Sequence, residues 1–373
     1  MKFLALLLFL SGLAMSTHAN ETVDPEKIVI GQSVELSGEA TGKENMEGAL
    51  AYFNWINARG GVYGRRIELK TYDDKRNPED TKKNTEKLIN EDHAFALFGY
   101  RSTPTIEATL PLLTQYEIPM IAPFSGAQSL HHPFNRYLFN LRASYQDEAA
   151  KMVETLATLK YAKVGILYQD DPFGKDGLQG FEGSLTSHNL KAAFTAKYDR
   201  KDMNIDAAVE ETVAANPQAM LMSCTPLACS EFVKRVHKRG SYPIFMMLSN
   251  VSSEIFFQSI GHDGGSVAVM QVMPNPHAFD ATVTQNFQHV LKEMASPPHS
   301  TYSTLEGFVA AKLLVEGLQA AGPNLTRKKL IAALEKMHNY DLGGVNVSYS
   351  TTNHDGSRFV EIVMVDKAGQ IER

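Results

Sequence analysis

The sequence predicts an exported α/β protein with two Rossmann-like lobes, each built on a parallel sheet. Short apolar runs alternate with helical periodicity along most of the chain, which is typical of parallel strands connected by helices. The segment from Ile28 to Asp74 is the first example: strand, glycine-rich turn, amphipathic helix, glycine-rich turn and strand. At 373 residues the chain also exceeds what one hydrophobic core usually supports. We therefore expect two lobes and a first turn that can face a ligand.

The first nineteen residues have the composition of a secretory signal peptide. Lys2 supplies a positive start, Phe3 to Leu13 form an apolar segment too short to span a bilayer, and Thr17-His18-Ala19 provide a small-residue cleavage site. No cysteine lies near that site, and no later segment approaches the roughly 20 apolar residues of a membrane helix. We expect the mature chain to be exported and soluble.

The charge balance argues against two classes of partner. The formal net charge is −6 at pH 7, and the lysines and arginines form no basic stripe. Nucleic acids and anionic membrane surfaces attract basic proteins, so we expect neither as a partner.

The alternation defines the elements in order. Apolar runs of strand length are expected to form strands at 28–34, 67–72, 94–99, 118–122, 163–168, 219–223, 244–248 and 267–272. Helical patterns lie between them at about 42–58, 78–91, 104–116, 146–160, 174–189, 206–215, 228–239 and 250–259. Right-handed crossovers would place the functional turns at the carboxyl edges of the strands.

This rhythm breaks twice, which predicts where the chain passes between lobes. It first breaks near Asn140 to Asp147, and again after Met273-Pro274-Asn275-Pro276. Helices expected at about 280–295, 302–321 and 326–338 have no sheet of their own, so we expect them to pack back on the first lobe. A closing β segment from Val345 to Ile371 would then turn as a hairpin at Asp355-Gly356.

The chain would thus cross between the lobes three times. Lobe 1 is expected to comprise residues 20–142 and 277–344, and lobe 2 residues 143–276 and 345–373.

Only two cysteines are present, Cys224 and Cys229. In an oxidising compartment they could close a small disulfide loop, but they could equally be two buried thiols on a strand–turn–helix. The Cα separation that a disulfide requires depends on the conformation of the turn, so both interpretations stay open.

The segment Gly99 to Thr105 ends a strand and begins a helix, which suits an anion site. Exposed N–H groups and the helix dipole favour negative charge there, and Ser102 or Thr103 could cap the helix. Arg101 adds a bidentate partner for carboxylate, phosphate or sulfonate. The competing interpretations are an ordinary N-cap and a solvated or salt-bridged surface arginine.

The order and spacing of several segments resemble one family. The chain is similar to type I periplasmic solute-binding proteins of ABC transporters, of the branch that includes the leucine/isoleucine/valine-binding protein. The segments that carry the resemblance are Ser37-Gly38, Asn57 to Arg65, Tyr72-Asp73-Asp74, Gly99 with the Ser/Thr run behind it, Ile118 to Pro123, Phe139 to Ala143 and Phe173-Gly174. The resemblance implies two hinged lobes in the periplasm that close on a small molecule and present it to a membrane permease.

The resemblance also implies roles for particular residues. Thr103 and the turn Phe124-Ser125-Gly126 would hold a ligand carboxylate, and Phe173 would cover the ligand unless it is a core residue. Thr225 would line the cleft. Asp147 would contact the ligand or, as we favour, cap the helix that follows it, and Arg142 at the crossover suits a hinge ion pair.

One departure from the family bears on the ligand. Amino-acid binders place an acidic residue after the strand at 244–248, where this chain has Ser249 and Asn250. A buried ammonium without a carboxylate is costly, so either Asp147 or Glu306 supplies the charge or the ligand is not an α-amino acid. Tyr145, with Phe124 and Phe173, would suit an aromatic or otherwise apolar carboxylate.

The predicted function is capture of a small solute for an ABC importer by a monomer without cofactor or metal. An exported receptor module of the same fold, reporting ligand to a sensor, is the alternative. An esterase or amidase would need Ser125 or Ser249 as nucleophile, and the sequence identifies no base near either.

Overall fold

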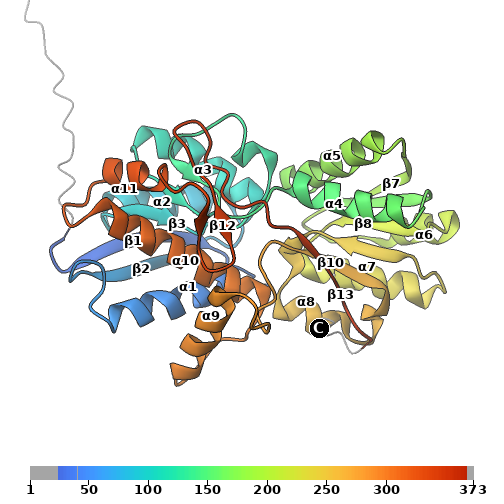
Figure 1. Ribbon diagram of the computed structural model, residues 1–373. Helices are drawn as coiled ribbons and strands as arrows, with labels where there is room; N and C mark the ends of the chain where they lie inside the picture. Colours follow the sequence, from blue (N-terminus) through green and yellow to red (C-terminus); the bar gives the residue numbers. More distant parts are fainter. Residues whose placement is uncertain (1–23, 40, 368–373) are drawn as a thin grey trace, which may run out of the picture.

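The computed structural model describes residues 24–39 and 41–367, in two lobes side by side (Figure 1). The predicted signal peptide and its cleavage site lie outside the described residues.

The first lobe is built on a five-stranded parallel sheet of order β2-β1-β3-β4-β5. Its strands are β1 (Lys27–Val34), β2 (Arg66–Asp73), β3 (Ala96–Phe98), β4 (Met120–Ile121) and β5 (Leu138–Phe139). Its helices are α1 (Thr41–Asn57), α2 (Pro78–Asn90) and α3 (Thr103–Gln115), joined late in the chain by α9 (Thr282–Glu293), α10 (Tyr302–Ala321) and α11 (Arg327–Leu334). Residues of α9, α10 and α11 share one apolar core with residues of β1 and α1, so we propose that these late helices belong to the first lobe.

The second lobe holds a six-stranded sheet of order β13-β10-β9-β8-β6-β7. Its strands are β6 (Val164–Gln169), β7 (Ala192–Tyr198), β8 (Ala219–Ser223), β9 (Ile244–Met247), β10 (Val267–Gln271) and the antiparallel β13 (Glu361–Met364). Its helices are α4 (Tyr145–Thr158), α5 (Pro172–Ser187), α6 (Asp206–Ala215), α7 (Pro226–Lys238) and α8 (Glu254–Ile260), with short 3₁₀ turns η2 (Ser249–Val251) and η3 (Gly261–Ser266). A further 3₁₀ turn, η1 (Gln128–Leu130), lies in the first lobe.

Two strands, one turn and one helix differ from the sequence-based expectation. β5 is only two residues long, and β7 alternates exposed and covered residues at the sheet edge, so neither forms a continuous apolar run. The predicted hairpin at Asp355-Gly356 is wrong: β12 (Asn346–Val347) pairs with β11 (Tyr340–Asp341), β13 pairs with β10, and Asp355 bridges Asn140 in parallel. The helix expected at 250–259 is divided into η2 and α8.

The chain passes between the two sheets three times, after β5, after β10 and between β12 and β13. Val347 and Tyr349 pack in the same apolar core as α10, and Ser357 still donates its backbone N–H to the carbonyl of Leu141 at 2.8 Å. We therefore propose that the last crossing lies beyond Ser357 rather than at residue 345.

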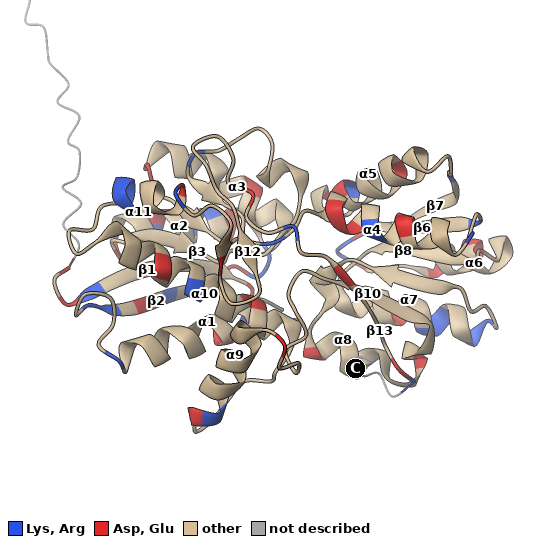
Figure 2. Ribbon diagram, viewed as in Figure 1, with Lys and Arg blue, Asp and Glu red and all other residues tan. Residues whose placement is uncertain are grey.

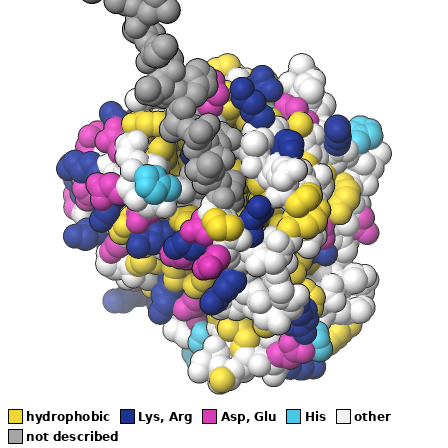
Figure 3. Space-filling model, turned by 90° about the vertical axis from the view of Figure 1, so that its left-hand side faces the viewer, with side chains coloured by type: hydrophobic (Ala, Val, Ile, Leu, Met, Phe, Trp, Pro, Cys, Tyr) yellow, Lys and Arg dark blue, Asp and Glu magenta, His cyan; other side chains and the backbone are white. Residues whose placement is uncertain are grey.

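Charged residues of both signs are interspersed along the ribbon of both lobes (Figure 2). The face seen in Figure 3 mixes acidic, basic and apolar side chains in the same way. Among residues 24–39 and 41–367, none of the helices has both the length and the apolar character that crossing a bilayer requires.

Helices α1 and α10 approach each other closely because each has a glycine at the crossing. A Cβ atom on Gly48 would collide with the carbonyl of Thr304, and one on Gly307 with the carbonyl of Asn45. The rings of Tyr52 and Phe308 meet edge to face beside them, 4.8 Å apart. This contact fixes α10, which comes from the far end of the sequence, onto the first lobe.

We predict that Gly307→Ala lowers the free energy of unfolding by about 1–3 kcal/mol, because the added methyl forces the two backbones apart. Urea denaturation of purified protein measures the change. Gly183→Ala is the matched control: Gly183 is exposed on α5, with nothing near the position of an added Cβ, so alanine should raise stability by about 0.4–1 kcal/mol. Equal effects of the two substitutions would contradict the close-crossing argument.

Candidate ligand-binding site

A cavity of about 450 Å³, including space open to solvent, lies between the lobes. Its walls lie at the carboxyl ends of the parallel strands, where open α/β sheets bind ligands. The first lobe contributes Arg76, Arg101, Ser102, Thr103 and Phe124, and the second contributes Tyr145, Gln169, Asp171, Phe173, Arg200, Thr225, Pro226 and Asn250.

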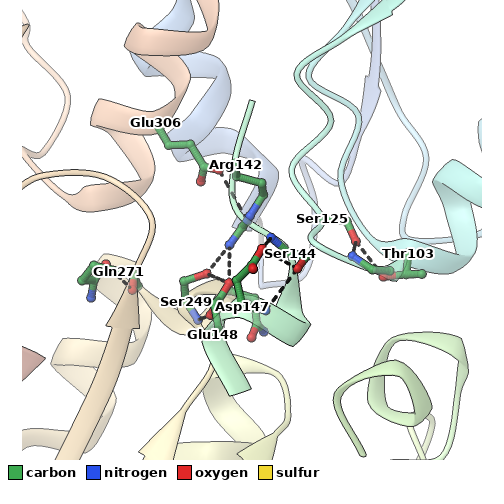
Figure 4. A network of polar contacts seen from close by, with 12 residues as sticks. Thr103, Ser125, Arg142, Ser144, Asp147, Glu148, Ser249, Gln271 and Glu306 are labelled. Carbon is green, nitrogen blue, oxygen red and sulfur yellow. Dashed lines mark hydrogen bonds and ion pairs between the residues drawn. The ribbon is translucent and has the colours of Figure 1, made fainter. Parts of the chain in front are cut away.

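The turn before α3 holds hydroxyl groups toward the cavity. Ser102 occupies the N-cap position at φ 80° but makes no capping hydrogen bond with its side chain, and Thr103 is the first helical residue. Ser102 is therefore the N-cap residue, as expected, but its side chain makes no capping hydrogen bond. A serine at positive φ is strained, and such strain concentrates at functional sites. The Thr103 hydroxyl lies 2.8 Å from that of Ser125 (Figure 4), which joins the two turns expected to hold a carboxylate.

Arg101 is the cation at the centre of this wall. Its Nη1 donates to Asn45 Oδ1 at 2.6 Å and its Nη2 to the carbonyl of Asn250, across the lobe boundary, at 2.8 Å. Among the described residues, no carboxylate lies within ion-pairing distance of it. Burial lowers the pKa of Arg101, and the negative charge of Glu306 only partly offsets this effect. Arg101 is therefore only partly exposed and not salt-bridged among the described residues.

Three aromatic rings line the cavity beside this cation. Phe124 follows β4 and packs edge to face on Phe98, with ring centroids 6.4 Å apart. Tyr145 and Phe173 meet at 5.5 Å, and both are nearly buried. The rings add an apolar surface to the cavity.

The second lobe adds polar residues that the sequence did not single out. Asp171 caps α5 through Gly174 N (3.0 Å), accepts from Gln169 Nε2 (2.6 Å) and lies 3.5 Å from Arg200 Nη1. The Asp-Pro pair before Phe173 was a recognisable helix start. Arg200 could not be placed because β7, which precedes it, was not predicted.

The two cysteines form a disulfide beneath this wall. The Cα atoms of Cys224 and Cys229 are 5.5 Å apart, so the turn has the conformation that the bond requires. Asn250 Nδ2 donates to the carbonyl of Cys224 at 3.0 Å. The bridge therefore holds Thr225 and Pro226 next to Asn250 at the cavity edge.

Four residues predicted for the site do not line the cavity. Ser125 lies behind Thr103, and Gly126 accepts the backbone N–H of Tyr145 at 2.7 Å. Asp147 forms a capping box with Ser144, which confirms the capping interpretation. Ser249 bonds to Glu148, away from the cavity.

Below the cavity, Arg142 bridges the lobes (Figure 4). Its Nη2 lies 3.4 Å from Glu148 of the second lobe and contacts Ser249, while its Nη1 lies 3.4 Å from Glu306 of α10. Burial raises the pKa of Glu148, and the positive charge of Arg142 only partly offsets this rise. Burial also disfavours the charged form of Arg142. The negative charge of Glu306, together with other neighbours, outweighs burial and raises the pKa of Arg142. The predicted hinge ion pair is confirmed.

Further hydrogen bonds join the two lobes. Gln128 N donates to Asp176 at 2.8 Å, Glu254 N donates to Glu44 at 3.0 Å, and Arg200 donates to the carbonyl of Arg76 at 3.1 Å. A partly open space between two α/β lobes, with a cation and hydroxyl groups on one wall, suits capture of a small anion.

The comparison with protein families matches residues 27–370 to the periplasmic binding protein model. The chain belongs to the periplasmic binding protein family. This binding protein is 21% identical to a Leu/Ile/Val-binding protein homolog 8 of Brucella suis, over 92% of its own length and 89% of the relative's. The type I, Leu/Ile/Val-binding-like character expected from the sequence is thereby confirmed.

Solved structures agree with this fold. A substrate-binding periplasmic protein from Ralstonia solanacearum is 31% identical, with a TM-score of 0.87 over 92% of this chain and 99% of that one. A fatty acid ABC transporter substrate-binding protein from Thermomonospora curvata is 20% identical, with a TM-score of 0.85 over 94% of this chain and 92% of that one. These relatives are named as binding proteins rather than enzymes.

We predict that Arg142→Met lowers the free energy of unfolding by about 3–5 kcal/mol, because it leaves the buried Glu148 and Glu306 without their cation. Urea denaturation at pH 7 measures the loss. Lys151→Met, which breaks the exposed pair with Glu154, is the control and should change stability little. A value for Arg142→Met close to that of the control would contradict a structural role for the hinge network.

Proposed function

We propose that this protein is the substrate-binding component of an ABC importer and captures a small carboxylate in the periplasm as a monomer. The observation that carries the proposal is Arg101, a guanidinium in the inter-lobe cavity whose side-chain hydrogen bonds, among the described residues, go only to neutral oxygens. An anionic ligand would supply the missing negative charge.

The expected binding mode follows from the cavity wall. Arg101 uses two of its five N–H groups for Asn45 and Asn250, so donors remain for a carboxylate. The first N–H groups of α3 and the hydroxyls of Ser102 and Thr103 would complete the oxygen-binding surface. The rest of the ligand would then lie against Phe124, Tyr145 and Phe173.

Ligand binding would favour the closed arrangement because the cavity draws on both lobes. A solute held by Arg101 on one side and Phe173 on the other interacts fully only when the lobes meet, and that differential affinity drives closure. The closed form is the one we expect the permease to recognise. The relatives include a Leu/Ile/Val-binding protein homolog and a fatty acid ABC transporter substrate-binding protein. Their names support a role in transport, but they differ in ligand, so the ligand class has to be inferred from the site itself.

The proposal is tested by calorimetry and small-angle X-ray scattering with a panel of amino acids and of aliphatic and aromatic monocarboxylates. We expect at least one carboxylate to bind and to reduce the radius of gyration. Arg101→Gln should weaken that binding by about 30-fold or more, because a desolvated charge partner is lost, and Thr103→Val by about 10-fold.

Arg66→Gln is the matched control, since Arg66 is exposed on β2 of the same lobe and should bind like the wild type. Full affinity in the Arg101 and Thr103 variants would contradict the carboxylate site. Binding without any change in the scattering curve would contradict capture by closure.

A further inference from the structure

We infer that the ligand is a carboxylate without an α-ammonium group: a monoanion with an apolar or aromatic body. This inference rests on the proposed function and narrows its substrate class. It comes from an inventory of the charges that face the cavity.

Each lining charge except Arg101 has an opposite charge beside it. Arg76 Nε lies 2.9 Å from Glu35 and its Nη2 3.6 Å from Glu39. Arg200 has Asp171. Asp171 is the one carboxylate among the lining residues, and it already accepts from Gly174 N, Gln169 Nε2 and Arg200.

The carboxylates deeper in the hinge are also engaged. Glu148 accepts the backbone N–H of Ser249 at 2.7 Å and its hydroxyl at 2.8 Å, and it shares Arg142 with Glu306. Ser249 thus holds a buried carboxylate in place instead of presenting one to the ligand. Neither Glu148 nor Glu306 is among the residues that line the cavity.

In an α-amino acid the ammonium and the carboxylate are attached to the same carbon. If Arg101 binds the carboxylate, the ammonium must lie beside it in the cavity. That ammonium would lie close to the guanidinium, in a partly desolvated space, without a free carboxylate to pair with. A ligand without the ammonium avoids both costs and keeps the contact with Arg101.

The rest of the cavity wall indicates the chemistry of the ligand beyond its carboxylate. Phe124, Tyr145 and Phe173 suit an aryl or alkyl body. Asn250 Oδ1 is buried at the same wall and has no hydrogen-bond partner among the described residues. A neutral donor such as a phenol hydroxyl or an amide N–H would satisfy this oxygen without adding charge.

The test compares amino acids with their deaminated analogues on the wild-type protein, by calorimetry at pH 7. The pairs are L-leucine with 4-methylpentanoate, L-phenylalanine with 3-phenylpropanoate, and L-tyrosine with 3-(4-hydroxyphenyl)propanoate. We expect each deaminated acid that fits to bind at least about 10-fold tighter than its amino acid. The hydroxylated aromatic acid should bind tighter than the unsubstituted one.

The outcomes separate this inference from the proposed function. Amino acids that bind as tightly as their deaminated partners would overturn the inference and leave carboxylate capture intact. The corresponding primary amides binding as tightly as the acids would overturn both, because Arg101 would then not be reading a carboxylate. If none of these probes binds, the inference is wrong. The proposed function is tested separately, by calorimetry with the full panel of amino acids and monocarboxylates and by the scattering measurement.

Discussion

The charge of Arg101 is the constraint on which the site depends. The residue stands at the end of β3, where a short strand gives way to α3, and the fold brings Asn45 and the Asn250 carbonyl to it from two sides. Neutral oxygens solvate a guanidinium without cancelling its charge, so the space between the lobes stays electropositive. The other charged groups that line the cavity are paired with opposite charges, so they leave the positive potential of Arg101 in place. The aromatic rings determine the shape of the ligand that can approach it.

The hinge network shows how the protein keeps other charges out of the cavity. Arg142, Glu148 and Glu306 are buried together, and Ser249 completes the coordination of Glu148. A buried group of this kind contributes specificity of arrangement more than stability, because pairing must first offset desolvation. In this protein the network connects α10, the first crossing segment and η2, so the two lobes are joined at one place next to the cavity.

Much of the architecture follows from the sequence because parallel strands buried on both faces form apolar runs that local pattern reveals. β1, β6 and β8 were predictable in this way, whereas β7 was not, because it lies at a sheet edge and alternates. The Asp355-Gly356 turn was misjudged since the chain there extends alongside Asn140 as part of the hinge. The Gly48–Gly307 contact could not be foreseen, because it joins residues far apart in the sequence.

The sequence could predict those site residues that belong to a recognisable local motif or to a segment resembling the family. Arg101 and Thr103 follow a strand that the sequence revealed, and the family resemblance indicated Phe124, Phe173 and Thr225. Arg76, Asp171 and Arg200 were missed because their role depends on how the lobes meet. The same is true of Ser249: the sequence shows that an acidic residue is absent there, but only the structure shows that the serine holds Glu148.

The most direct measurement is a crystal structure of the protein with the tightest-binding acid. The account predicts closed lobes with the carboxylate oxygens about 2.7–2.9 Å from the guanidinium nitrogens of Arg101 and the ligand body against Phe124, Tyr145 and Phe173. A carboxylate bound elsewhere, with Arg101 still held only by Asn45 and Asn250, would contradict it.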